Sequence, residues 1–182
     1  SVTVSFAIAP LISAASAVFL GPLAARKIGM SGRSGCTVAF NGLPSPVPSA
    51  RVVKNGVLLA APFVTVSTSA NGERGLLGVA LHPQFASNGW VYLYYTSSTG
   101  GAHNRIVRYT ASGDVAAGAE TILADLPNLS SAANHNGGAL HFGPDGKLYV
   151  AVGDNATGSN AQSMSITFGK MLRFNDDGSI PN

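Results

Sequence analysis

The sequence predicts an all-β protein that forms part of a β-propeller, with about two to three blades of four antiparallel strands each. Composition is the first reason, because charged residues make up only 10% of the 182 residues, while Gly numbers 22 and Pro 10. Together with the shortness of the apolar runs, this composition favours many short strands joined by turns. The second reason is an internal repeat, and the third is the number of strands that each repeat holds.

The repeat relates two parts of the chain that show the same order of features. Residues 78–94 resemble residues 138–152, because each segment has a short apolar strand, a turn that closes on Gly and a second strand with Tyr at the same place. Residues 105–113 match residues 170–178. Each unit holds about four strands, as one blade does, and propellers close with roughly four to eight blades. We therefore expect at most about three blades here, as the front part of a longer ring.

The first residues of the chain have a different character. Residues 7–25 form an uncharged apolar stretch, long enough for the core of a signal peptide or a marginal membrane span. The nearest basic residue, Arg26, follows this stretch, whereas a secretory signal carries its charge before the apolar core. An export segment, a poorly packed leader and a damaged reading of the sequence all stay open. Because residues 30–50 have no usable period and predict loop or disorder, we divide the chain into a leader and irregular segment, 1–50, and a propeller portion, 51–182.

Strands are expected from Arg51 onward. The pair Asn55-Gly56 lies between apolar runs, which is a strong signal for a tight hairpin turn. Apolar, aromatic or alternating runs predict further strands at 62–66, 73–83, 90–95, 105–109 and 120–126. The runs 139–142 and 148–152 flank a Gly-Pro-Asp-Gly turn and predict another hairpin.

His135, at the mouth of this last hairpin, is the best candidate for chemistry. The Gly137-Gly138 pair beside it has no side chains, so a flat ligand or another backbone could approach the imidazole closely. A histidine with its ordinary pKa of about 6.5 is an efficient general base near neutral pH. The other three histidines are expected to be structural or solvated: His82 and His141 within apolar strands, and His103 exposed in a polar loop.

Several classes of function are disfavoured by the sequence. The net charge of +3 comes from scattered basic residues without interleaved aromatics, which argues against nucleic-acid binding. Cys36 is the single cysteine, so the chain has no internal disulfide and no cysteine zinc site. Residues 175–178, Asn-Asp-Asp-Gly, lack the spacing and the closing glutamate of an EF-hand and predict a turn, so no metal ligands are assigned in this chain. Arg105 and Arg108 alternate with apolar residues and are interpreted as solvated strand positions.

Five motifs follow one another over the propeller portion, at residues 72–85, 104–109, 134–138, 143–154 and 169–175. In this order they resemble the motifs of the soluble quinoprotein sugar dehydrogenases, the glucose/sorbosone dehydrogenase family that uses pyrroloquinoline quinone. The resemblance covers the chain from about Val52 to Asn182. It implies a six-bladed propeller with the quinone lying flat across the top, near the central axis.

The resemblance also implies an activity and site residues. The activity is oxidation of the anomeric CH–OH of aldose sugars, with hydride transfer to pyrroloquinoline quinone and His135 as general base. Glu73, Asn134 and Asn155 match positions where the family places polar side chains that bind substrate or cofactor. The family also uses calcium, and its calcium ligands and the basic residues that pair with the three cofactor carboxylates are expected beyond Asn182. We therefore expect the chain by itself to be inactive.

The partners implied are a small-molecule sugar or alcohol and an external electron acceptor, in a periplasmic or secreted setting. Membrane contact is left open, as is the preferred sugar. The principal alternative is a non-catalytic binding module, because propellers with this sequence signature also serve as interaction domains and fold does not fix function. A truncated or frameshifted product with no role of its own is the third alternative.

Overall fold

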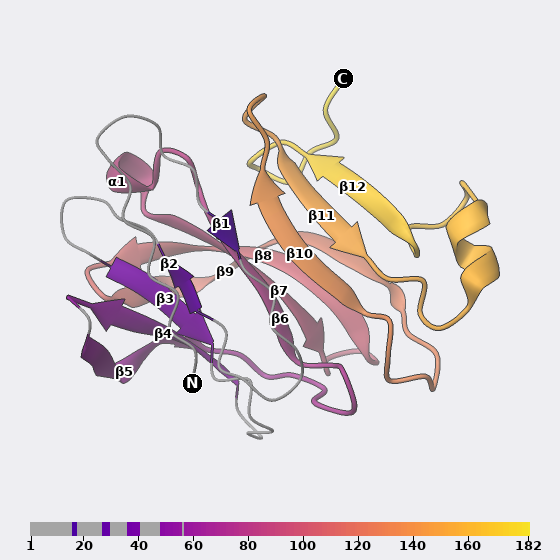
Figure 1. Cartoon of the computed structure of the whole chain (residues 1–182), viewed down its shortest axis with the longest axis horizontal. Coiled ribbons are helices and arrows are strands. Elements are labelled where there is room, and N and C mark those ends of the chain that lie inside the picture. The colour runs from indigo at the N-terminus through magenta and orange to yellow at the C-terminus, as the bar shows by residue number, and fades with distance from the viewer. Residues whose placement is uncertain (1–15, 18–26, 30–35, 41–47, 56) are drawn as a thin grey trace.

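The computed structural model of the chain describes residues 16–17, 27–29, 36–40, 48–55 and 57–182 (Figure 1). These residues form three antiparallel sheets in which each strand pairs with the next along the chain. The first sheet contains β1 (Ser16–Ala17), β2 (Lys27–Gly29), β3 (Cys36–Phe40), β4 (Ser49–Lys54) and β5 (Val57–Thr65). The β4–β5 hairpin turns at Asn55, whose φ of 51° lies in the left-handed region, as the predicted tight turn requires.

The second and third sheets repeat this up-and-down order. The second contains β6 (Leu76–Leu81), β7 (Trp90–Ser97), β8 (His103–Ser112) and β9 (Val115–Asn128), with the short helix α1 (Phe85–Asn88) between its first two strands. The third contains β10 (Gly137–Phe142), β11 (Leu148–Val152) and β12 (Lys170–Phe174), with the 3₁₀ helix η1 (Gly158–Gln162) before its last strand. The two repeated segments thus occupy matching places in successive sheets, which confirms the all-β partial propeller.

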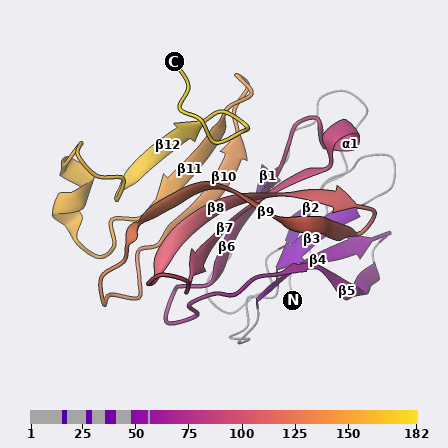
Figure 2. The same cartoon turned by 180° about the vertical axis from the view of Figure 1, so that it is seen from behind.

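The second sheet lies between the first and the third (Figures 1 and 2), and its strand β7 is buried on both faces. Strand β7 shows why the sequence permits this, because successive side chains of a strand point to opposite faces. Val91, Leu93 and Tyr95 join the core shared with the first sheet, and Tyr92 and Tyr94 join the core shared with the third. The apolar and aromatic side chains of β7 therefore contribute to both inter-sheet cores.

The innermost strands of the second and third sheets, β6 and β10, approach each other through glycines. A Cβ atom on Gly78 would lie 1.9 Å from the carbonyl oxygen of Gly138, and one on Gly138 would lie 2.6 Å from the Cβ of Leu77. A Cβ on Gly137 would lie 2.4 Å from the carbonyl oxygen of Ala151. Of the two alternatives for the Gly137-Gly138 pair, the structure shows the close approach of protein backbone.

Several expectations from the sequence are wrong, the first two at β3 and His103. Strand β3 lies within residues 30–50, where the sequence predicts loop or disorder, and pairs along its whole length with β4. The five residues of β3 are too few for a period to be recognised, and their pairing with β4 defines them as a strand. His103 is only 6% exposed, because it begins β8 and its ring contacts Gly101 O at 2.8 Å and Asp125 Oδ1 at 3.1 Å.

The other histidines outside the hairpin mouth differ from each other. His82 is buried, and its Nδ1 accepts hydrogen bonds from the Gln84 amide at 3.1 Å and from the Asn88 side chain at 2.7 Å, which confirms the structural interpretation. Burial lowers the pKa of His82, so this ring stays neutral. His141 is exposed on β10, so the structural interpretation is wrong for this residue. Most of the apolar stretch 7–25 lies outside the described residues, among which the structure contains no helix long and apolar enough to span a membrane.

Arg105 is not a solvated strand residue, because it lies inside a cluster of polar side chains on the second sheet. Its side chain donates to Asp125 Oδ2 at 2.9 Å and to Glu120 Oε1 at 3.1 Å. The hydroxyls of Tyr95 and Tyr109 also donate to Glu120. The guanidinium holds the pKa of the Asp125 carboxyl below its ordinary value of 3.8.

We expect Asp125→Asn to lower the free energy of unfolding near neutral pH by up to about 1 kcal/mol, because Asp125 is half exposed and solvent screens the pair. A carboxyl whose pKa is lower in the folded state stabilises the protein above the unfolded-state pKa and loses that contribution as the pH falls. The difference between wild type and variant should therefore shrink as the pH falls below 3.8. Urea unfolding at a series of pH values measures it, and a constant difference would contradict the assignment.

Candidate active site

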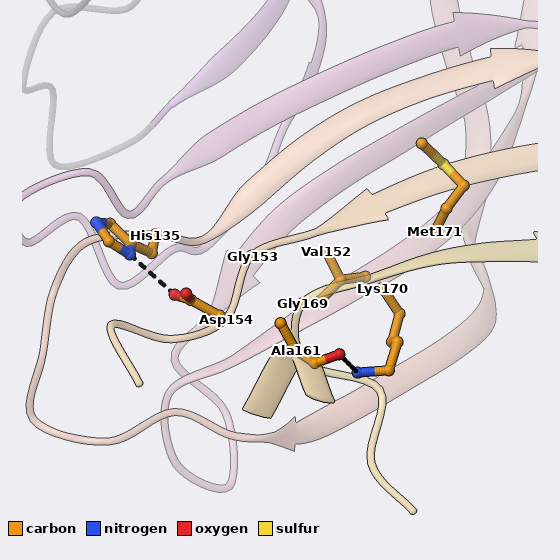
Figure 3. A pocket seen from close by; sticks show the side chains of 8 residues that line it. All are labelled: His135, Val152, Gly153, Asp154, Ala161, Gly169, Lys170 and Met171. Carbon is orange, nitrogen blue, oxygen red and sulfur yellow. Dashed lines mark hydrogen bonds and ion pairs between the residues drawn. The ribbon is translucent and has the colours of Figure 1, made fainter. Parts of the chain in front are cut away.

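His135 lies in the loop between β9 and β10, with its side chain 55% exposed (Figure 3). Its Nδ1 is 2.8 Å from Oδ1 of Asp154, which follows the end of β11. An ionised carboxylate only accepts hydrogen bonds, so this contact assigns the ring proton to Nδ1 and leaves the lone pair on Nε2. Within the described part of the chain Nε2 makes no hydrogen bond. The geometry is that of an oriented imidazole base.

The backbone of the His135 loop is held by two neighbouring residues that precede β6. The Glu73 carboxylate accepts the His135 amide hydrogen at 2.8 Å, and the Glu73 amide donates to the carbonyl oxygen of Ala133 at 2.8 Å. Arg74 donates from Nη2 to the carbonyl oxygens of Ser130 and Ala132, at 2.6 and 3.1 Å. Glu73 and Arg74 therefore bind the backbone of four residues of the loop, within the range 130–135.

The segment after β11 supports His135 from the other side. The carbonyl oxygen of His135 accepts the Asn155 amide hydrogen at 3.2 Å. Gly153 passes so close that a Cβ atom on it would lie 1.7 Å from the same oxygen. His135 itself has a φ of 56°, in the left-handed region that non-glycine residues rarely adopt. Such a conformation persists where surrounding contacts enforce it, and these contacts do so here.

An open cavity of about 410 Å³ lies beside the imidazole. Its lining residues are His135, Val152, Gly153, Asp154, Ala161, Gly169, Lys170 and Met171. Lys170 donates from Nζ to the carbonyl oxygens of Asn160, Ala161 and Phe168, at 2.8 to 3.1 Å. Figure 3 shows the bond to Ala161. An ammonium group has three donors, so these contacts use all of them within the fold. Residues 48–55 and 57–182 contain no group of three or more His, Cys, Asp or Glu side chains placed to hold a metal ion.

The structure places the four predicted site residues differently. Glu73 and His135 are joined by a hydrogen bond, and Asn134 is exposed next to His135 with no side-chain hydrogen bond in the described ranges. Asn155 is only 5% exposed, and its Oδ1 accepts from Ser130 rather than lining the cavity. The binding roles of Glu73, Asn134 and Asn155 stay predictions, as does the role of His135 as the base.

Asp154 is the residue that sequence reasoning missed. In the sequence, Gly153-Asp154 indicates only that a strand ends there. One further signal was present: Asp154 is an acidic residue two positions after the end of β11, and β11 pairs with β10, the strand that follows His135. In a hairpin these two ends meet, so the spacing alone could have placed a carboxylate next to the imidazole.

Comparisons with known proteins converge on one family. The family model described as "Glucose / Sorbosone dehydrogenase" matches residues 49–182. Aldose sugar dehydrogenase YliI of Escherichia coli K12 is 30% identical over 98% of this chain and 51% of its own length. The PQQ-bound aldose sugar dehydrogenase of Streptomyces coelicolor superposes with a TM-score of 0.64 at 27% identity, over 92% of this chain and 51% of that one.

A relative of another kind also matches. Hedgehog-interacting protein of Homo sapiens is 33% identical over 118 residues, which are 59% of this chain and 17% of that protein. The chain spans about half the length, or less, of the curated relatives that it matches.

Proposed function

The chain belongs to the glucose/sorbosone dehydrogenase family, and from that premise we propose that the natural full-length protein oxidises the anomeric CH–OH of aldose sugars or related alcohols with pyrroloquinoline quinone. The observation that carries the proposal is the His135–Asp154 pair beside the open cavity. The pair engages Nδ1 and leaves the lone pair of Nε2 able to accept a proton. The family's aldose sugar and glucose dehydrogenase relatives support the substrate class.

His135 acts as the general base. Its Nε2 takes the proton of the anomeric hydroxyl while the hydrogen on the same carbon leaves as hydride, so the carbon loses two electrons and becomes a carbonyl. Asp154 keeps the Nδ1 proton in place and stabilises the imidazolium that forms. Glu73 holds the backbone amide of His135 and so fixes the loop that carries the ring. A positioned base of this kind contributes about 10²- to 10⁴-fold to a rate.

Pyrroloquinoline quinone, when bound, supplies the hydride acceptor. The cavity has room for the reacting part of such a flat group, because it is open and has a volume of about 410 Å³ beside His135. It does not supply partners for the three carboxylates, since Lys170 is the basic residue of the lining and its donors are used. We propose that residues beyond Asn182 bind these carboxylates and a calcium ion, and that the chain by itself is inactive. A periplasmic or secreted location and an external electron acceptor complete the proposal.

The test uses the natural full-length protein with pyrroloquinoline quinone and calcium added. Reduction of a dye by glucose, xylose or another aldose is expected, and no reduction should follow when the cofactor is left out. A correctly folded protein that binds the cofactor and oxidises no aldose or related alcohol would refute the proposal. Failure of the folded protein to bind the cofactor would favour the alternative below.

The alternative is a non-catalytic binding module, and the match to Hedgehog-interacting protein favours it. That protein is 33% identical over 118 residues of alignment, so part of this sequence has a counterpart in a protein named for an interaction. Under this alternative Glu73 and Asp154 would serve the fold of the loop alone. Pull-down with the folded protein, compared between wild type and a His135→Gln variant, separates the two functions, because only the enzyme needs the imidazole.

Asp154→Asn is expected to lower kcat by about 10²-fold, the lower end of the range for general-base catalysis. The amide can donate to Nδ1, which moves the ring proton to Nε2, and it removes the charge that stabilises the imidazolium. Dye-reduction kinetics measure the change. Asp114→Asn is the matched control. Asp114, between β8 and β9, forms an ion pair with Lys54 at the end of β4, and neither residue lines the cavity. Equal kcat values for wild type and Asp154→Asn would show that the pair does not orient the base.

A further inference from the structure

Strand β7 carries two tyrosines whose rings are buried and whose hydroxyls each donate to a backbone carbonyl. Tyr92 and Tyr94 are both 0% exposed and lie on the face of β7 that packs against the third sheet. The Tyr92 hydroxyl donates to the carbonyl oxygen of Asp176 at 2.9 Å, and that of Tyr94 donates to the carbonyl oxygen of Asn136 at 2.8 Å. Each tyrosine therefore connects the second sheet to a loop of the third, but at different places.

The Tyr94 bond ends at the residue next to His135. The same Asn136 carbonyl also accepts a hydrogen from Nδ2 of Asn104, at 3.3 Å. Asn136 is 2% exposed, so this carbonyl has no water to replace a lost donor. Two buried donors from the second sheet thus hold the backbone directly after the imidazole.

The second donor is itself oriented. The Thr96 hydroxyl donates to Oδ1 of Asn104 at 2.8 Å, which directs the Asn104 amide nitrogen toward Asn136. The Thr96 amide donates to the carbonyl oxygen of Gly75 at 2.8 Å, in the segment that carries Glu73. The network therefore joins two segments that hold the His135 loop. The segment with Glu73 binds the His135 amide, and the segment with Asn104 binds the Asn136 carbonyl.

We propose that Tyr94 is a positioning residue for His135: its hydroxyl, together with the Asn104 amide, holds the Asn136 carbonyl and so keeps the ring proton on Nδ1, against Asp154, and the lone pair on Nε2. The left-handed φ of His135 needs such restraint, because a histidine released from it relaxes to a commoner backbone conformation. A relaxed loop turns the ring away from Asp154. Burial raises the pKa of Tyr94 far above neutrality, so the hydroxyl is a donor at all physiological pH values.

The experiment compares Tyr94→Phe with Tyr92→Phe in the natural full-length protein. Both variants remove one hydroxyl from a fully buried ring on the same strand, and both leave a backbone carbonyl without that donor. Both are expected to lower the thermal stability, Tyr94→Phe the more, because its hydrogen bond is buried whereas that of Tyr92 is partly exposed. Tyr92→Phe controls for the general loss of an inter-sheet hydrogen bond, because its partner Asp176 is remote in sequence from His135 and does not line the cavity.

The first readout is the ¹⁵N spectrum of the histidine rings, with the His135 signals assigned by their absence in His135→Gln. Wild type and Tyr92→Phe are expected to show the proton on Nδ1, whereas Tyr94→Phe is expected to show a mixture of the two tautomers. The second readout, which rests on the proposed function, is turnover. Here kcat is expected to fall about tenfold in Tyr94→Phe, as the loss of one buried hydrogen bond permits, with KM within about twofold of wild type.

The outcomes separate this inference from the proposed function. A wild type without turnover refutes the function, while the tautomer of His135 still tests Tyr94. Unchanged tautomer in Tyr94→Phe, or the same mixture in Tyr92→Phe, overturns the inference. Asn104→Leu removes the second donor to Asn136 and is expected to shift the tautomer in the same direction, which keeps the test decisive if Tyr94→Phe folds poorly.

Discussion

Replacement of His135 by Gln is expected to lower the kcat for the proposed sugar oxidation by about 10²- to 10⁴-fold, the full contribution of a general base. The substituted amide has no lone pair basic enough to take the anomeric proton, although it can keep a hydrogen bond to Asp154. The unfolding free energy should change little, because the ring is more than half exposed and its principal contact is with Asp154. Dye-reduction kinetics with the natural full-length protein and its cofactor measure the loss.

His141→Gln is the matched control for that experiment. His141 is also an exposed histidine of the third sheet, but it lies on β10 and does not line the cavity. Its replacement is expected to leave kcat unchanged within about twofold, since it makes no contact with the reacting groups. Undiminished turnover in His135→Gln would remove the base from the mechanism and leave the His135–Asp154 pair as a feature of the fold.

Gly153→Ala is expected to destabilise the protein by about 3 kcal/mol, the upper end of the range for overpacked interiors. The new methyl group would lie 1.7 Å from the carbonyl oxygen of His135 and 2.3 Å from its carbonyl carbon. Neither atom belongs to a flexible side chain, so the loop or β11 must move. Displacement of the loop should also lower kcat, because the imidazole would lose its alignment with Asp154.

The control for this substitution is Gly158→Ala, five residues further along the chain. A Cβ atom on Gly158 would meet no heavy atom within 4 Å, and its backbone is not left-handed. Urea denaturation of the two variants is expected to give a normal unfolding free energy for Gly158→Ala and a much reduced one for Gly153→Ala. Equal stability of the two would show that the loop tolerates displacement and that its conformation is not enforced by packing.

The fold was predictable because it repeats. Residues 78–94 and 138–152 carry the same alternation and turn residues, and each forms the first two strands of its sheet. Local patterns of this kind need no knowledge of partners distant in the chain. The expectation failed at β3, where five residues are too short for a pattern, and at His103, which is buried by the register between β8 and β9.

The sequence by itself determined the all-β repeat, the family and the histidine at the mouth of a hairpin. The tertiary structure alone decided which groups surround that histidine. It brought Asp154 onto Nδ1, turned the Asn155 side chain away from the cavity, and placed the Tyr94 hydroxyl on the neighbouring carbonyl. The physical reason is that a strand pattern records which face of a strand is buried, whereas a hydrogen bond depends on angles and distances between segments of different sheets.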